Sequence, residues 1–76
     1  PVRAVATGTT LRIVGLRRNT DYTVTLTDAR GRVRSVRRTT GTRGVVSLST
    51  AQRPRGVYIV ELRRGQHQRS MTTVIP

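Results

Sequence analysis

Side chains that could do acid–base or nucleophilic chemistry are few in this sequence. The 76 residues include one histidine, three carboxylates and no cysteine. The histidine, His67, lies between Gln66 and Gln68 in a polar segment, where we expect a solvated side chain. A Ser/His/Asp set needs its three groups in contact, and a chain rich in Ser and Thr offers such combinations by chance. We therefore expect no catalytic residues and no enzyme activity.

The same side chains argue against a metal or cofactor site. Zinc and calcium sites draw several ligands from His, Cys, Asp and Glu side chains. Here Asp21 and Asp28 are seven residues apart, and Glu61 is the third acid. No Gly-rich phosphate loop precedes a helix, because no segment has the apolar spacing of a helix. We expect no metal ligand and no cofactor.

The arginines are the most distinctive chemical groups. All fifteen basic residues are arginines, and the net charge is +12. Guanidinium groups attract nucleic acid, anionic lipid and acidic polysaccharide. Recognition of single strands usually adds exposed aromatic rings, whereas Tyr22 and Tyr58 have the spacing of core residues. We expect nonspecific attraction of polyanions and no sequence-specific nucleic-acid binding. A GC-rich genome is the alternative explanation for the exclusive use of arginine.

Seven short strands must position these groups. Eleven valines and thirteen threonines favour strands, since β-branched side chains suit a pleated surface. The predicted strands, each bounded by turn signals, are Arg3–Thr7, Thr10–Val14, Tyr22–Asp28, Arg32–Thr39, Val45–Ser49, Val57–Arg63 and His67–Ile75. With no helix between them, they predict an all-β fold, a seven-stranded antiparallel Ig-like β-sandwich that forms one domain over residues 1–76.

Alternation along the strands predicts the core, because successive side chains point to opposite faces of a sheet. Leu11 and Ile13 share one face of the second strand. The core set is Tyr22, Val24, Leu26, Val46, Leu48, Tyr58, Val60 and Leu62. In the fourth strand Val33 and Val36 have opposite parity, so either a β-bulge resets the alternation or one valine is exposed. We favour the bulge.

The segment RGVYIVELRRG, residues 55–65, has apolar side chains on both faces. The face opposite the core begins with Val57 and Ile59 and continues with Glu61 and Arg63. Either a loop or chain end covers the two apolar side chains, or they form a surface for a partner.

Three segments together carry a resemblance to a known family. LTDARGRV contains Asp28, Gly31 and Arg32, and GVYIVEL contains Gly56, Tyr58 and Val60. The chain then ends in the basic and apolar segment RSMTTVI, residues 69–75. In this order the segments resemble the motifs of the type A C-terminal sorting domain of the type IX (Por) secretion system.

Four of the six motif residues also have a physical role that we expect. Gly31 supplies the positive φ of a hairpin turn, and Asp28 accepts hydrogen bonds from the turn amides. Gly56 relieves the corner after Pro54. Tyr58 fills the core while its hydroxyl finds a polar partner.

The resemblance implies the C-terminal domain of a longer secreted protein, which passes through the periplasm to the outer membrane or cell surface. It also implies three kinds of partner: the translocon with its outer-membrane shuttle protein, a sortase-like cysteine protease, and an anionic lipopolysaccharide. Met71, Thr73 and Ile75 share one face of the terminal strand, which could add to a sheet edge. The candidate partner-binding residues are Val57, Ile59, Arg69, Met71, Thr73 and Ile75.

Two alternatives remain. A structural or adhesive module of a cell-surface protein, Ig-like, fibronectin-like or prealbumin-like, would have much the same segment over residues 11–28. A sorting domain must end its parent protein, whereas an adhesive module can lie anywhere in it. The third interpretation is a basic β-domain that binds polyanions, which salt-dependent binding would identify.

Overall fold

The computed structural model describes residues 2–41 and 43–76, and seven strands account for most of them. The strands are β1 (Arg3–Thr7), β2 (Thr10–Val14), β3 (Thr20–Asp28), β4 (Val33–Gly41), β5 (Val45–Ser49), β6 (Gly56–Arg64) and β7 (His67–Ile75). The all-β prediction is confirmed, and each strand end lies within two residues of its predicted position. A search of the described residues finds no helix long and apolar enough to cross a membrane.

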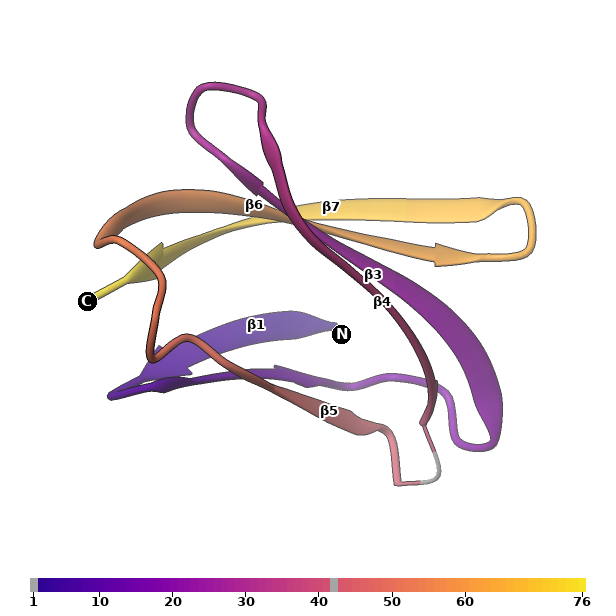
Figure 1. Ribbon diagram of the computed structural model, residues 1–76. Helices are drawn as coiled ribbons and strands as arrows, with labels where there is room; N and C mark the ends of the chain where they lie inside the picture. Colours follow the sequence, from indigo (N-terminus) through magenta and orange to yellow (C-terminus); the bar gives the residue numbers. More distant parts are fainter. Residues whose placement is uncertain (1, 42) are drawn as a thin grey trace.

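The strands form two antiparallel sheets that face one another (Figure 1). One sheet has three strands in the order β1-β2-β5, and the other has four in the order β4-β3-β6-β7. Hairpins join β1 to β2, β3 to β4 and β6 to β7. The chain crosses from one sheet to the other at its remaining three connections, β2–β3, β4–β5 and β5–β6.

Apolar side chains from both sheets fill the space between them. The buried set is Leu11, Ile13, Leu16, Tyr22, Val24, Leu26, Val46, Leu48, Tyr58, Val60, Leu62 and Ile75. It contains all eight predicted core residues and the pair Leu11 and Ile13. Leu16 and Ile75 were not predicted as core. Leu16 lies in the connection between β2 and β3, where strand alternation gives no information.

The fourth strand contains the predicted bulge, because its register against β3 shifts by one residue at Arg34. Val33 and Val36 therefore lie opposite Thr27 and Thr25, on the same face of the sheet. That face is the outer one, and the two valines are 59% and 61% exposed. The bulge aligns the valines with each other but turns both away from the core.

The connection between β4 and β5 brings two backbone segments close together. The turn predicted at residues 41–44 includes Thr42, which lies outside the described residues. Gly44 has φ +75°, and a Cβ atom built on it would lie 2.7 Å from the carbonyl oxygen of Leu16. The Leu16 N–H donates a 3.0 Å hydrogen bond to the Gly44 carbonyl oxygen. Only glycine fits this approach without a shift of the backbone.

Candidate functional site

The turn between β3 and β4 is organised by one carboxylate. The backbone N–H groups of Arg30 and Arg32 each donate a 2.9 Å hydrogen bond to Oδ1 of Asp28. The Gly31 N–H donates to the Asp28 carbonyl oxygen at 3.0 Å, and Gly31 has φ +84°. These are the roles predicted for Asp28 and Gly31, and the geometry confirms them.

The same contacts keep the Asp28 carboxyl ionised. The hydrogen bond from the Arg32 N–H is the largest cause that lowers the pKa of Asp28 below its ordinary value. Desolvation opposes it, while the Arg30 N–H and the nearby guanidinium groups of Arg34 and Arg32 lower the pKa further. The Arg34 Nε atom lies 3.9 Å from Asp28 Oδ2, a loose ion pair on the open side of the turn.

The corner before β6 is held by a buried tyrosine. The Tyr58 side chain is 3% exposed, and its hydroxyl donates a 2.8 Å hydrogen bond to the carbonyl oxygen of Pro54. Gly56 has φ +144°, a conformation that other residues rarely adopt. The roles predicted for Gly56 and Tyr58 are thus confirmed, and Val60 is fully buried in the core.

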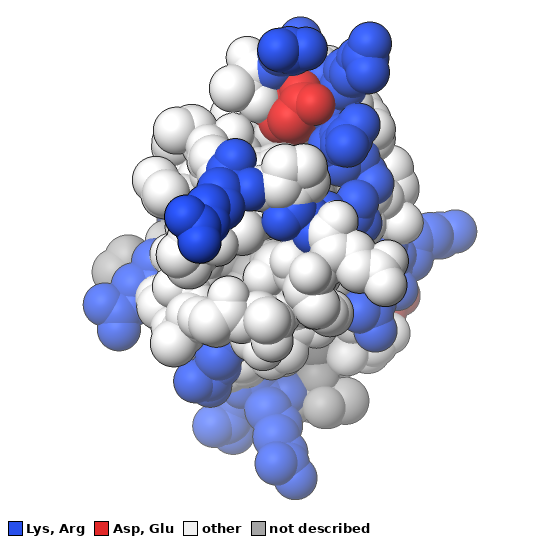
Figure 2. Space-filling view, turned by 60° about the vertical axis from the view of Figure 1, so that its left-hand side comes forward, with Lys and Arg blue, Asp and Glu red and all other residues white. Residues whose placement is uncertain are grey.

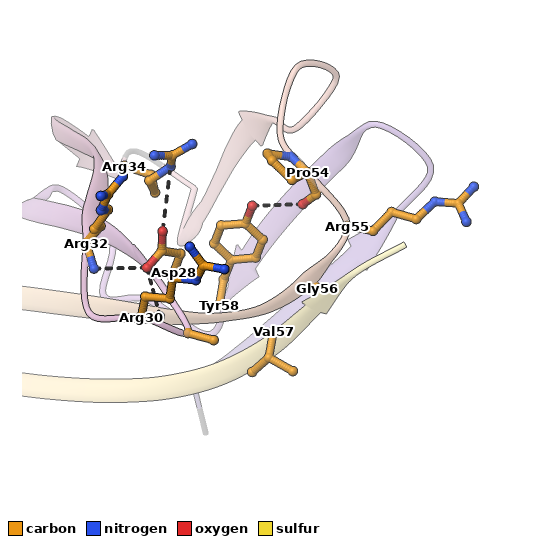
Figure 3. A pocket seen from close by; sticks show the side chains of 10 residues that line it. Asp28, Arg30, Arg32, Arg34, Pro54, Arg55, Gly56, Val57 and Tyr58 are labelled. Carbon is orange, nitrogen blue, oxygen red and sulfur yellow. Dashed lines mark hydrogen bonds and ion pairs between the residues drawn. The ribbon is translucent and has the colours of Figure 1, made fainter.

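The turn and the corner meet around a surface pocket of about 400 Å³, which we call the turn pocket. Four of the six motif residues line it, namely Asp28, Arg32, Gly56 and Tyr58. In Figure 3 the side chains of Arg30, Arg32 and Arg34 lie on the Asp28 side of the pocket, and that of Arg55 points away. Residues from two motifs that are distant in the sequence therefore form one feature of the surface.

The outer face of the four-stranded sheet is the second candidate surface. Val57 and Ile59 are 46% and 39% exposed, so no loop or chain end of the described residues covers them fully. In the strand register, Val74 of β7 lies opposite Val57 of β6. Val33 of β4 lies in the same cross-strand row as Ile59, with Thr27 of β3 between them. We call this cluster the apolar face; it consists of Val33, Val36, Val57, Ile59 and Val74. Of the six large exposed apolar residues in the described part of the chain, five belong to it and the sixth, Val5, lies on β1.

The structure corrects the expectation for the terminal strand. Met71, Thr73 and Ile75 do share one face of β7, but that face is turned towards the core. Ile75 is 2% and Thr73 8% exposed, because the inner face of this edge strand packs over the β1 side of the sandwich. Thr73 and Ile75 therefore cannot reach a partner while the sandwich is intact, whereas Met71 is only partly buried. Arg69 lies beyond the core and is exposed, and the exposed apolar residue of β7 is Val74, which the prediction missed.

The sequence carried only part of the signal for Val74. It alternates with Thr73 and Ile75, so once those two face inwards, Val74 must face outwards beside Val57. The sequence showed the alternation but offered no means to choose which face was the inner one.

On the side of the molecule seen in Figure 2, arginine side chains are spread over the surface and few Asp or Glu side chains lie between them. His67 is exposed on β7. A search of residues 2–41 and 43–76 finds no group of three or more His, Cys, Asp or Glu side chains that could hold a metal ion.

Comparison with known proteins identifies the fold. No protein-family model matches the chain, and no curated protein matches it. Among solved structures the chain is similar to a DUF3244 family protein from Bacteroides vulgatus, described as having an immunoglobulin-like beta-sandwich fold. The TM-score is 0.80 at 19% sequence identity, over 100% of this chain and 84% of that chain. At this identity the likeness extends to the fold alone, which is the immunoglobulin-like sandwich of two antiparallel sheets.

Proposed function

We propose that this chain is an immunoglobulin-like binding module that docks an acidic partner protein through the apolar face. The observation that carries the proposal is the gathering of five of the six large exposed apolar side chains on one sheet face. Single exposed apolar residues are ordinary, whereas several gathered on one sheet face that nothing in the described chain covers are typical of an interaction site. The module acts by binding, and we propose no catalytic role.

The charge of the chain indicates the chemistry of the partner. On the same outer face, beyond the apolar side chains, Arg38 and Arg63 flank Thr23 in one row of the sheet. With a net charge of +12, two copies of this chain repel one another, which disfavours self-association through this face. An acidic rim around an apolar patch would complement both the apolar side chains and the arginines.

The strand order supports a more specific assignment of the module type. We propose that β1, β2 and β5 correspond to strands A, B and E of an immunoglobulin-like module, and β4, β3, β6 and β7 to C′, C, F and G. In this assignment the apolar face lies on the C′CFG sheet.

Site-specific photocrosslinking in the full-length parent protein tests the docking proposal. A crosslinking residue is placed at position 57 or 74, and at position 5 as the control, because Val5 is equally apolar but lies on β1 of the other sheet. We expect positions 57 and 74 to give one common adduct with an acidic protein, and position 5 to give none. Adducts between two copies, or the same adducts from all three positions, would contradict the proposal.

Titration of the purified partner then measures the contribution of the face. The double variant Val57→Thr/Val74→Thr keeps the β-branched shape at two exposed positions, so the fold should be unaffected. We expect binding to weaken about tenfold or more, and Val5→Thr to leave it unchanged. Equal affinities of the two variants would contradict the proposal.

A second candidate function is export by the type IX secretion system, with the translocon, shuttle protein and sortase-like protease as partners. Two observations support it. Four motif residues meet at the turn pocket, and β7 is an edge strand whose nine residues pair on one side only with β6. Under this proposal the mature location is the outer membrane or cell surface.

The test of the second candidate is a reporter with this domain at its C-terminus, expressed in a host with an active type IX system. Appearance of the reporter at the cell surface would support the sorting role. Its retention in the periplasm, while the native cargo is exported, would exclude it. Deletion of residues 72–76 is not a suitable control, because it removes Ile75 from the core and should unfold the domain. Arg69→Gln, at an exposed position of the same strand, is the better variant.

A further inference from the structure

A second pocket lies at the opposite end of β3 from the turn pocket. It has a volume of about 330 Å³, and its lining includes Arg17, Tyr22, Leu62, Arg64 and Arg69. We call it the end pocket. Three arginines line it, and no carboxylate is among its described lining residues. The turn pocket, by contrast, contains the Asp28 carboxylate.

Strand register explains why Arg64 and Arg69 line this space. In the β6–β7 hairpin Arg64 pairs with His67, and Arg69 pairs with Leu62 of the core. Successive side chains of a strand point to opposite faces, so Arg64 and Arg69 lie on the same inner face as Leu62. They extend that face beyond the core. The hairpin extends beyond the N-terminal end of β1, so the inner face is not covered there by the other sheet (Figure 1). Arg64 is accordingly half-buried rather than fully solvated.

The third arginine comes from the connection between β2 and β3. The Arg17 N–H donates a 2.9 Å hydrogen bond to the hydroxyl of Tyr22, which is 7% exposed. This bond holds the Arg17 backbone at the rim of the pocket. In the part of the chain that the structure describes, the guanidinium groups of Arg17, Arg64 and Arg69 make no hydrogen bond or ion pair with protein groups. Each therefore keeps its donors available for a ligand.

We propose that the end pocket binds the phosphate monoester of a small organic group, such as a sugar phosphate. Three guanidinium charges without a carboxylate match a group that carries about −1.5 to −2 charge at neutral pH better than a single carboxylate. The pocket is larger than a phosphate alone, and the buried side chains of Tyr22 and Leu62 offer a surface for the attached group. This site is separate from the apolar face.

Calorimetric titration tests the proposal with glucose 6-phosphate, inorganic phosphate and acetate as probes, at a constant ionic strength of about 0.15 M to screen distant charges. We expect glucose 6-phosphate to bind more tightly than inorganic phosphate, and acetate to bind least. If inorganic phosphate binds as tightly as glucose 6-phosphate, the pocket recognises only the phosphate group. That result would contradict the contact that we propose between the sugar and the side chains of Tyr22 and Leu62. Absence of binding by both phosphates would overturn the proposal.

Two double variants distinguish phosphate binding in the end pocket from attraction by the net charge of the chain. Arg64→Gln/Arg69→Gln and the control Arg30→Gln/Arg32→Gln each lower the net charge from +12 to +10, since each removes two guanidinium groups. The first changes the end pocket and the second the turn pocket. We expect at least tenfold weaker binding in the first and less than twofold change in the second. Equal losses would show that the phosphate is attracted only by net charge. As a control, circular dichroism and urea unfolding measure whether both variants are folded.

Discussion

Gly44 and Gly31 offer a matched pair for measuring the close approach of two backbone segments. Both have positive φ, +75° and +84°. A Cβ atom at Gly44 would lie 2.7 Å from the Leu16 carbonyl oxygen, whereas one at Gly31 would meet nothing within 4 Å. The substitutions Gly44→Ala and Gly31→Ala therefore share the conformational cost and differ in the steric one.

The expected magnitudes follow from these distances. A non-glycine residue in the left-handed region costs about 1–2 kcal/mol, which is the whole expected effect of Gly31→Ala. At Gly44 the added methyl group overlaps a backbone atom that cannot rotate away, and overpacking of this kind typically costs about 1–3 kcal/mol more. The 3.0 Å hydrogen bond from Leu16 N–H to the Gly44 carbonyl resists separation of the two segments. We therefore expect Gly44→Ala to lower the free energy of unfolding by about 2–5 kcal/mol.

Urea unfolding followed by circular dichroism measures both losses, and the difference between the variants isolates the steric term. The slope of the transition should be the same in both, since neither change alters the surface exposed on unfolding. Equal losses in the two variants, or a larger loss for Gly31→Ala, would refute the close approach of Gly44 to Leu16.

The remaining predictions concern the core and the turn carboxylate. Leu26→Ala should lower the free energy of unfolding by about 2–5 kcal/mol, while Val36→Ala on the outer face should change it by less than about 0.5 kcal/mol; similar urea midpoints for the two would refute the core assignment. The pKa of Asp28 is lowered in the folded state, so its stabilising contribution is present above the ordinary value of 3.8 and is lost as the pH falls below it. Asp28→Asn should thus reduce stability at neutral pH and remove part of the loss in acid, as urea midpoints across about pH 5 to 2 would show. Unchanged acid dependence in this variant would contradict the role of the carboxylate.

Local patterns predicted the strands, most of the core and the β3–β4 turn because their causes are local. The alternation of Tyr22, Val24 and Leu26 follows from the two-residue period of a strand, whatever it packs against. Asp28 and Gly31 act within five consecutive residues, so their hydrogen bonds and positive φ were predictable from residue type and spacing. The bulge in β4 was signalled by the opposite parity of its two valines.

The sequence by itself therefore determined the all-β class, the strand positions and the turn chemistry, while the tertiary structure decided which face of each strand is covered. Thr73 and Ile75 are buried because β7 packs over the side of the sandwich where β1 lies, far away in sequence. Val57 and Val74 are exposed because no other element of residues 2–41 and 43–76 covers them on the outer face of their sheet. The end pocket likewise joins Arg17 to Leu62, Arg64 and Arg69 of a hairpin far along the chain. Alternation places side chains on one of two faces, but only packing against distant segments makes one of those faces the interior.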